Sequence, residues 1–313
     1  MNGIELSEAF YRQFGEPMLR EKFPDLLNKI AVGVAGGGSD SYGFDDILSR
    51  DHDYSPGFCI FLPDENVVSR RAEFLLERAY SSLPDEFMGI KRARLSPVGG
   101  NRRGVMRISD FFMRTTGSPD GNLSDEQRLH IADSYMFEAT NGKIFCDNYG
   151  LITEIRDRLK KIPEDVFLKK IAGCLIVMNQ SGQYNFRRCT ARGETAAAQL
   201  ALYEFAGAAM KIAFTLENEY MPYYKWSFYA LRRLKKFAFL APMLEFLITM
   251  GNGEENIREK CLVIETVAEK TAQEAMSVTG AESGTEDLEK LAYAVNDKIK
   301  SGKIRNLNIF SAV

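Results

Sequence analysis

Two acidic side chains near residue 50 have the type and spacing needed to bind a divalent cation. Asp51 and Asp53 are separated by one residue, so an extended backbone would place both carboxylates on the same face. Carboxylate oxygens are the protein ligands that Mg²⁺ prefers, usually together with water and substrate phosphates. Two such ions would activate an attacking oxygen and stabilise a departing pyrophosphate. The pair therefore predicts a magnesium site in which Asp51 and Asp53 are both metal ligands and catalytic residues.

A glycine-serine turn precedes this acidic pair. Gly38 and Ser39 follow the apolar run 30–35, and eleven residues separate Ser39 from Asp51. A turn of this composition can present backbone amides and a hydroxyl group to phosphate oxygens. The glycines do not match a Walker loop, which requires a lysine, and their spacing differs from the dinucleotide-binding fingerprint. Together with the acidic pair, the turn predicts a site for a metal-bound nucleoside triphosphate.

The elements that must position these residues are those of a domain with helices and strands. Apolar residues at helical spacing occupy 5–29, with a break near Pro24, and a second helical segment is expected at 67–83. Apolar or β-rich runs occur at 30–35, 57–62, 103–108 and 142–147. This order predicts a mixed sheet with flanking helices. Because Pro56 cannot donate to a β ladder, we place the acidic pair at the entry of the second strand.

Strand signals stop after about residue 150, and long amphipathic stretches follow. These stretches are 151–180, 193–218, 222–250, 254–278 and 284–301. We therefore predict an α+β chain, with a mixed sheet and its helices in residues 1–157 and an all-α helical bundle in residues 158–313.

Composition limits the partners. The 313 residues, 45% of them hydrophobic, are enough for two medium domains, and a net charge of -3 gives no general reason to bind nucleic acid or an anionic membrane. Five scattered cysteines and two histidines support neither a disulfide framework nor a zinc site. The absence of a signal peptide and of a run of about 18 apolar residues predicts a cytoplasmic protein without a membrane partner. A modest basic patch, 91–94 with Arg102 and Arg103, is interpreted as a solvated loop.

Gly38-Ser39, the eleven-residue gap and Asp51-His52-Asp53 before a hydrophobic strand resemble the signature of nucleotidyltransferases of the DNA polymerase beta type. More narrowly, four segments resemble, in order, a bacterial family of unknown function with a nucleotidyltransferase-like N-terminal half: GSDSYGFDDILSRDHDYSP, GKIFCDNYGLITEIRDRL, QSGQYNFRRCTARGE and ENEYMPYYKWSFYALRRL. The helical half also resembles that of the kanamycin nucleotidyltransferases, in which helical-domain residues complete the active site. The resemblance spans roughly residues 5–250 and implies a catalytic domain followed by a helical substrate-binding domain.

The resemblance implies magnesium-dependent transfer of a nucleoside monophosphate, AMP by default, from a triphosphate such as ATP to a hydroxyl group. Gly38 and Ser39 would bind the triphosphate, and the acceptor would be a small molecule, a protein or an RNA. A third carboxylate is expected, but the strand where it often lies offers Arg107. The candidates for this acid are Asp110, Asp147 and Glu194. The missing acid leaves open an alternative, a catalytically inactive nucleotide-binding sensor or scaffold.

Polar and aromatic residues gather at 183–188 and 220–226 in the helical half. A guanidinium group suits phosphate recognition, and an aromatic ring can stack on a base. With the resemblance, the residues expected to contact the nucleotide are Gln183, Asn185, Arg188 and Lys225. Without it, 183–188 is interpreted as a solvated turn, and Lys225 equally as a surface lysine lying along apolar neighbours. Apolar residues at helical spacing in 258–276 would pack on the bundle or form a homodimer with a second copy.

Overall fold

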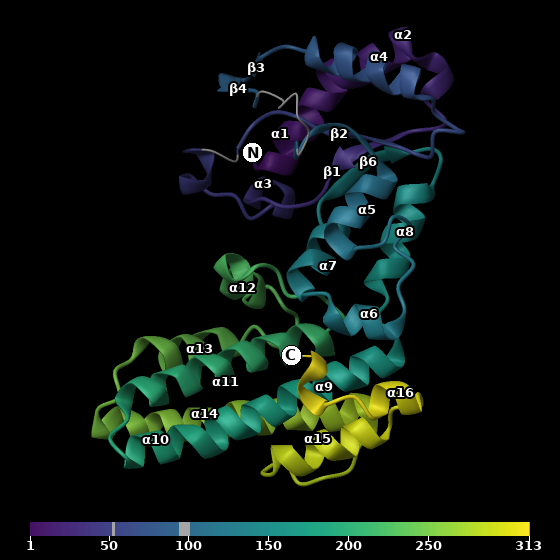
Figure 1. The fold of residues 1–313 in the computed structure, drawn as a ribbon. Coiled ribbons are helices and arrows are strands. Elements are labelled where there is room, and N and C mark those ends of the chain that lie inside the picture. Colours follow the sequence, from purple (N-terminus) through teal and green to yellow (C-terminus); the bar gives the residue numbers. More distant parts are fainter. Residues whose placement is uncertain (52–53, 94–100, 313) are drawn as a thin grey trace. The chain divides into compact units, whose positions relative to one another are not determined.

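The computed structural model describes residues 1–51, 54–93 and 101–312 (Figure 1). The chain divides into two compact units, which we call unit 1 and unit 2. Unit 1 comprises Met1–Asn122 and Tyr135–Lys160, and unit 2 comprises Leu123–Ser134 and Lys161–Val313.

Four strands form the main sheet of unit 1. They are β1 (Ala31–Val34), β2 (Cys59–Leu62), β5 (Gly104–Arg107) and β6 (Lys143–Asp147), in the order β5-β2-β1-β6. β1 runs antiparallel to both β2 and β6, whereas β2 and β5 are parallel, so the sheet is mixed. Each strand lies within one of the four runs predicted from the sequence, and these predictions are confirmed.

Helices and short turns complete unit 1. The helices are α1 (Gly3–Phe10), α2 (Glu16–Lys22), α3 (Ser39–Tyr42), α4 (Arg70–Ser81), α5 (Ile108–Thr116), most of α7 (Asp133–Thr140) and α8 (Leu151–Lys160). Two short strands, β3 (Glu86–Phe87) and β4 (Ile90–Lys91), form a separate hairpin. The helix predicted within 67–83 is confirmed as α4. No helix was predicted for α5 or α7.

The N-terminal helix begins with a capping box and ends before a proline. Asn2 and Glu5 exchange side-chain to backbone hydrogen bonds of 2.9 Å, which satisfies amide groups at the helix start. The helix continues through a π-helical turn, Tyr11–Gly15, into α2. It stops at Phe23 because a following proline disfavours helical backbone in the residue before it. The break predicted near Pro24 is confirmed.

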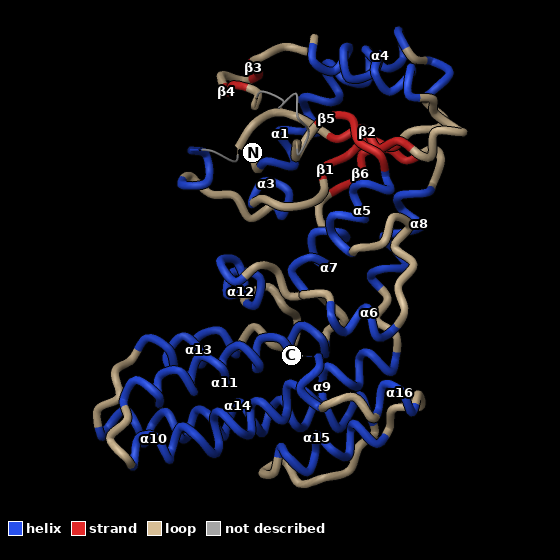
Figure 2. Tube along the Cα trace, viewed as in Figure 1, coloured by secondary structure: helices blue, strands red, loops and turns tan. Residues whose placement is uncertain are grey.

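Both faces of the central strand β2 are covered by helices. Ile60 and Leu62 belong to a buried core that includes Phe10 of α1 and Leu76 of α4. The ring of Phe61 points the other way, and its centroid lies 5.4 Å from that of Phe111 on α5. Because successive strand residues face opposite sides of a sheet, the N-terminal helices and α4 cover one face and α5 the other (Figure 2).

Unit 2 is helical in its described residues. Its helices are α6 (Asp125–His130), α9 (Glu164–Met178), α10 (Arg187–Ala191), α11 (Thr195–Leu216), α12 (Tyr224–Leu231), α13 (Leu240–Thr249), α14 (Glu254–Thr279), α15 (Leu288–Asp297) and α16 (Gly302–Arg305). A π-helical stretch, Asn179–Phe186, joins α9 to α10, and a 3-10 turn occupies Ile309–Ala312. The predicted fold class, a mixed sheet with flanking helices followed by a helical bundle, is confirmed.

Small residues allow close packing inside the bundle. A methyl group at Gly182 would lie 2.3 Å from Cδ2 of Phe205, so the π-helical stretch can approach α11 this closely only with glycine at that position. Buried alanines on α11, among them Ala198, Ala206 and Ala209, have small side chains that likewise allow this helix to pack closely against α9. The bundle thus gains apolar burial from shape as well as from large side chains.

The division into units differs from the predicted domains in one segment. The predicted boundary at residue 157 falls inside α8, three residues before unit 1 ends at Lys160. Residues 123–134, which the sequence analysis placed in the N-terminal domain, belong to unit 2 because α6 packs on α9. Nη1 of Arg128 donates to the carbonyl oxygen of Lys161 at 3.3 Å in this contact region.

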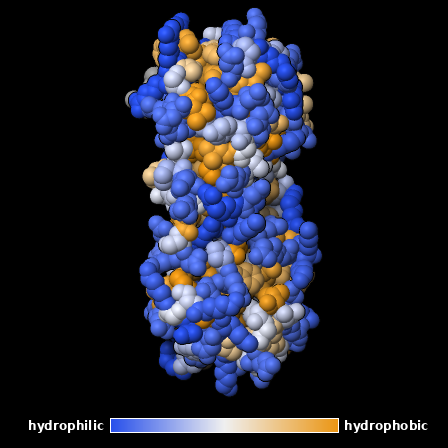
Figure 3. Space-filling model, turned by 90° about the vertical axis from the view of Figure 1, so that its right-hand side faces the viewer, coloured by the Kyte–Doolittle hydropathy of each residue, from blue (hydrophilic) through white to orange (hydrophobic). Residues whose placement is uncertain are grey.

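The helices of the described residues are all too short or too polar to cross a membrane. The molecular face drawn in Figure 3 is mostly hydrophilic, and its hydrophobic residues lie in small separate patches. A cytoplasmic location stays a prediction.

Candidate functional site

A glycine-rich turn joins β1 to α3 at the place predicted from the sequence. Gly36 and Gly38 have φ angles of 93° and 107°, which residues with a side chain rarely adopt. Asn141 holds the turn, because its Oδ1 accepts from the amide of Gly36 at 3.0 Å and its Nδ2 donates to the carbonyl of Gly36 at 2.9 Å. Ser39 is the first residue of α3 and is buried. The turn is therefore fixed by contacts within unit 1.

A buried acid follows the turn and is bound by two arginines. Oδ2 of Asp40 accepts from Nη2 of Arg103 at 2.7 Å, and Oδ1 of Asp40 pairs with Arg102. The same nitrogen of Arg103 donates to Oγ of Ser41 at 2.9 Å, and Nε of Arg102 donates to the carbonyl of Gly37 at 3.0 Å. The two guanidinium groups thus converge on the turn and on the carboxylate beside it.

The register of the sheet brings three segments together at one end of the strands. Gly33 of β1 pairs with Cys59 of antiparallel β2, so the last residues of β1 lie beside the first residues of β2. Cys59 also pairs with Gly104 of parallel β5, so β5 begins at the same end of the sheet's strands. This end of the strands therefore carries the glycine turn after β1, the residues just before β2, and the arginines at 102 and 103.

The predicted metal ligands precede β2 in the sequence. Asp51 is the last residue of a 3-10 turn, Leu48–Asp51, and Asp53 lies outside the described residues. Among the residues that the structure does describe, no three His, Cys, Asp or Glu side chains gather closely enough to hold a metal ion. The magnesium site and the bound triphosphate stay predictions.

A cavity of about 240 Å³ opens beside the turn. Its lining includes Gly37, Arg102, Arg114 and Glu138. Glu138 accepts a hydrogen bond of 2.9 Å from the hydroxyl of Tyr42, and its Oε1 would lie 3.2 Å from a methyl group on Gly37. Burial, together with this carboxylate, raises the pKa of Tyr42, so the phenol keeps its proton and remains a donor. The cavity thus combines two guanidinium groups with one carboxylate next to the turn.

Two of the candidates for a third carboxylate lie at the opposite end of the strands. Asp147 pairs with Ala31, the first residue of β1, and its carboxylate oxygens accept from the amides of Gly150 and Thr153 at 2.8 and 2.9 Å. Asp110 lies in the first turn of α5, beyond the carboxyl end of β5. Asp147 therefore stabilises the start of α8, and neither acid approaches the glycine turn.

The residues predicted to contact the nucleotide from the helical half lie in unit 2. Nε2 of Gln183 donates to Oε2 of Glu265 on α14 at 2.6 Å, so this amide already has a partner within the bundle. Asn185 is half-buried. Arg188 is exposed, with its guanidinium carbon 4.8 Å from the ring centroid of Tyr184. Of these three side chains, Arg188 is the most accessible to a ligand.

Lys225 and Glu194 are both exposed. Lys225 is in the first turn of α12, and its Nζ lies 5.6 Å from the ring centroid of Trp226. Glu194 immediately precedes α11, and its amide donates to the carbonyl of Cys189 at 2.9 Å. Neither side chain makes an ion pair with a described residue. The predicted catalytic role of Glu194 and the nucleotide contact of Lys225 stay predictions.

Several residues at the turn were missed by the sequence analysis. Arg103 is 8% exposed and paired with Asp40, so its interpretation as part of a solvated basic loop is wrong. The signal that could have found it is the acid directly after Ser39, which requires a basic partner if it is buried. Glu138 and Asn141 gave no local signal, because only the tertiary fold brings α7 to the turn.

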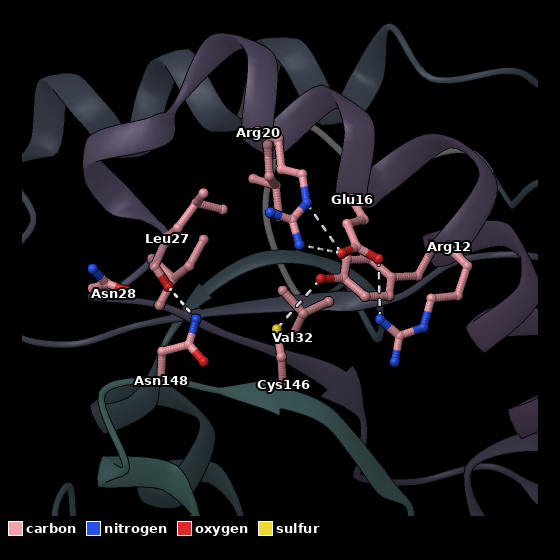
Figure 4. A pocket seen from close by; sticks show the side chains of 11 residues that line it. Arg12, Glu16, Arg20, Leu27, Asn28, Val32, Cys146 and Asn148 are labelled. Atoms are coloured by element: carbon pink, nitrogen blue, oxygen red, sulfur yellow. Dashed lines mark hydrogen bonds and ion pairs between the residues drawn. The ribbon is translucent and has the colours of Figure 1, made fainter.

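A second cavity of unit 1, of about 320 Å³, lies beside the N-terminal helices (Figure 4). Glu16 is held by Arg20 at 2.7 Å and by Arg12 at 3.0 Å, and these arginines lower its pKa. The hydroxyl of Tyr11 lies 3.4 Å from Sγ of Cys146, and burial followed by this contact raises the pKa of Tyr11. The charged groups of this cavity are thus paired with one another, which points to a structural role.

Residues 129–227 match a sequence family described as a domain of unknown function (DUF4037). No curated protein matches the chain. Among solved structures, the chain is similar to a nucleotidyltransferase-like protein from Exiguobacterium sibiricum 255-15, with 12% identity, a TM-score of 0.37, and coverage of 85% of this chain and 80% of that chain. The segment matched by the family runs from α6 to α12.

Proposed function

We propose that this protein is a nucleotidyltransferase that moves a nucleoside monophosphate, AMP by default, from a triphosphate to a hydroxyl group of an acceptor. The register between β1 and β2 supports the proposal most directly. It puts the glycine turn beside the start of the strand that follows Asp51 and Asp53 in the sequence. Phosphate ligands and metal ligands have to meet in this way if a metal-bound triphosphate is the substrate.

Each part of the proposed site has a role that its chemistry can fulfil. Gly38 and Ser39 would offer backbone amides and a hydroxyl to the triphosphate. Asp51 and Asp53 supply the carboxylate oxygens that Mg²⁺ prefers, and one or two bound ions would neutralise phosphate charge. Exposed Arg188 and Lys225 in unit 2, with Gln183 and Asn185, stay the proposed contacts to the nucleotide from the helical half.

The reaction would be an in-line displacement at phosphorus. The acceptor oxygen forms a bond to the α-phosphorus, the bond from that phosphorus to the bridging oxygen breaks, and pyrophosphate leaves. The hydroxyl proton passes to a carboxylate acting as general base. Glu194 is the base proposed from the sequence, and Glu138 is a second candidate because it borders the glycine turn.

Label transfer tests the proposal and identifies the acceptor. The protein is incubated with Mg²⁺, α-labelled ATP and a cell extract, and the label is located in small molecules, protein or RNA. Asp51→Asn and Asp53→Asn should each abolish transfer without loss of helical signal in circular dichroism. Asp85→Asn is the control, because this aspartate is 99% exposed in the same unit. Full transfer by both of the first two variants would reject the assignment.

A nucleotide-binding sensor or scaffold without catalysis is the second candidate. It is favoured by the absence of an acid from β5 and by the two arginines that already occupy Asp40. Calorimetry with ATP and Mg²⁺ separates the two functions when it is combined with the label experiment. Tight binding with no labelled product and no released pyrophosphate from any extract favours the sensor. A cytoplasmic location and a homodimer through the helical half stay predictions in either case.

A further inference from the structure

Unit 2 contains a cavity of about 470 Å³ that the proposed transfer reaction does not use. Its walls come from residues 129–134, from α9 and α11, and from residues 221–224. Its volume falls within the range of roughly 300 to 1,000 Å³ that is usual for small-molecule sites. Apart from Ser311, every lining residue lies within 129–227, the segment matched by the family of unknown function. One sequence segment thus builds almost the whole cavity.

A buried lysine forms part of the inner wall. Lys170 on α9 is 5% exposed, and its Nζ pairs with Oδ1 of Asp133. The same nitrogen lies 5.5 Å from the ring centroid of Tyr220. Burial raises the pKa of Tyr220 to about 12, so this ring adds no charge near neutral pH. Pairing with Asp133 is what makes the buried ammonium tolerable, since an isolated buried charge is costly.

A second lysine on the wall has no such counter-ion. Lys211 on α11 is half-buried, and it makes no ion pair with a described residue. In the described part of the chain, the cavity is lined by one carboxylate, Asp133, and two lysines. The charge of Asp133 balances that of Lys170, so the charge of Lys211 is not balanced by another described lining residue. The cavity is electrostatically suited to an anion.

Two tyrosine rings stand at the cavity beside the start of α12. Tyr223 and Tyr224 are 50% and 74% exposed, and their ring centroids lie 4.4 Å apart. Exposed aromatic rings of this kind offer faces on which a planar ligand can stack. Buried Pro222 precedes them in the lining and keeps the approach to the rings rigid.

We propose that this cavity binds a small acidic molecule that carries a planar ring. Its phosphate or carboxylate group pairs with Lys211, and its ring lies against Tyr223 and Tyr224. Lys170 and Asp133 form the neutral inner wall that fixes the depth of the site. None of its lining residues is itself named as a ligand of the triphosphate or of Mg²⁺, and Lys225, a proposed nucleotide contact, directly follows Tyr224.

Calorimetric titration of the full chain with four probes tests the site. Phenyl phosphate and benzoate carry both ring and charge, inorganic phosphate carries charge alone, and benzyl alcohol carries a ring alone. One of the two ring-bearing acids should saturate a single site and bind at least roughly 10-fold more tightly than either partial probe. The tighter of the two identifies the acid group.

Variants place the probe in the cavity. Lys211→Met keeps the length of the side chain and removes its charge, so binding of the ring-bearing acid should weaken roughly 10-fold. Tyr224→Ala should weaken it about 5-fold and leave inorganic phosphate unaffected. Lys270→Met is the matched control, because this lysine is exposed on α14 outside the cavity, and it should bind as the unaltered protein does.

Four results would overturn the proposal. The first is a lack of saturable binding of either acid, and the second is equal affinity for benzyl alcohol or inorganic phosphate. The third is unchanged affinity in a folded Lys211→Met protein. Asp51→Asn should bind the probe normally even where it abolishes nucleotidyl transfer, which separates this site from the proposed reaction. Loss of probe binding in Asp51→Asn would assign the probe to the metal site and likewise overturn the proposal.

Discussion

Nη2 of Arg103 lies 2.7 Å from Oδ2 of Asp40, and both side chains are more than nine-tenths buried. The pair joins the start of β5 to α3, across 63 residues of sequence. Removing one partner of a buried ion pair leaves the other charge without compensation, which costs far more than the pair itself contributes. Asp40 and Arg103 therefore act as a structural clamp on the segment that carries the glycine turn.

Arg103→Met should lower the free energy of unfolding of unit 1 by about 3 to 5 kcal/mol. The loss arises because Asp40 then keeps Arg102, whose side chain is 38% exposed, as its single charged partner among the described residues, beside the amide of Ser41. Hydrogen exchange of the β1 and β2 amides measures this loss within unit 1. Arg71→Met, at an exposed position of α4, is the control and should stay within about 0.5 kcal/mol of the unaltered protein. Equal protection in the two variants would contradict the clamp.

Gly38→Ala should destabilise unit 1 for two separable reasons. The backbone at Gly38 has φ of 107° and ψ of 143°, a region open almost only to glycine, and a methyl group there would lie 1.9 Å from Nη2 of Arg102. Gly89→Ala is the comparison at a positive φ without a close contact, because φ is 76° and nothing lies within 4 Å of the added carbon.

We expect the free energy of unfolding of unit 1 to fall by about 1 kcal/mol in Gly89→Ala and by about 2 to 3 kcal/mol in Gly38→Ala. Gly207→Ala, inside α11 and free of close contacts, should instead stabilise unit 2 by about 0.5 to 1 kcal/mol. Thermal unfolding followed by circular dichroism gives all three values. A Gly38→Ala protein as stable as Gly89→Ala would show that the side chain of Arg102 is free to move aside.

The sheet could be predicted because its strands carry their own boundaries. The run that became β2 is apolar and lies between Pro56 and Pro63, which cannot donate within a ladder. α5 was not predicted, because Ile108 follows Arg107 without any glycine or proline to separate helix from strand. The local sequence pattern therefore identified elements that are bounded by proline or glycine, and it failed where a helix follows a strand directly.

The candidate site divides in the same way. The turn at Gly38 and Ser39 could be predicted from sequence, because a turn after an apolar strand is a local feature, whereas its role as a phosphate site stays a prediction. The partnership of Arg103 with Asp40 depends on β5 lying parallel to β2, which no local pattern encodes. Glu138 was missed for the same reason, since α7 reaches the turn only through the tertiary fold.

Glu16→Gln tests the charge network of the N-terminal helices through its pH dependence. Hydrogen bonds from Arg20 and then Arg12 hold the pKa of Glu16 below its ordinary value in the folded chain. A lowered folded-state pKa stabilises the fold above the ordinary value near 4.5, and this stabilisation is lost as pH falls through the lowered pKa.

At pH 7 we expect Glu16→Gln to lower the free energy of unfolding by about 0.5 to 1 kcal/mol, since the pair is partly exposed. The difference from the unaltered protein should vanish at acidic pH. Glu21→Gln, at an exposed neighbouring position, is the control and should stay within about 0.5 kcal/mol of the unaltered protein at pH 7. A Glu16→Gln deficit that is the same at pH 7 and in acid would show that shape, and not charge, sets the contribution of this residue.

Lys169 ties α9 to the C-terminal segment of unit 2. Its ammonium group is fully buried and donates to the carbonyl of Leu307 at 2.7 Å, to Oδ1 of Asn296 at 2.9 Å and to the carbonyl of Arg305 at 3.2 Å. Lys169→Met would remove this donor from all three acceptors, although the carbonyl of Arg305 also accepts from Nδ2 of Asn296 at 3.3 Å. We expect a loss of about 2 to 4 kcal/mol in the free energy of unfolding of unit 2, because unsatisfied buried polar groups are costly.

The pH dependence distinguishes this role from simple packing. Burial lowers the pKa of Lys169 below its ordinary value of 10.5. Between the lowered and the ordinary pKa the unfolded chain binds more protons than the folded one, so the free energy of unfolding gains a rising contribution with pH there. Lys169→Met should lack that contribution, whereas Lys298→Met, at an exposed position nearby, should keep it. Urea unfolding followed by the fluorescence of Trp226, the single tryptophan and a residue of unit 2, measures both variants. Because packing alone has no proton linkage, an identical alkaline dependence in Lys169→Met and in the unaltered protein would show that the ammonium is not the group that titrates.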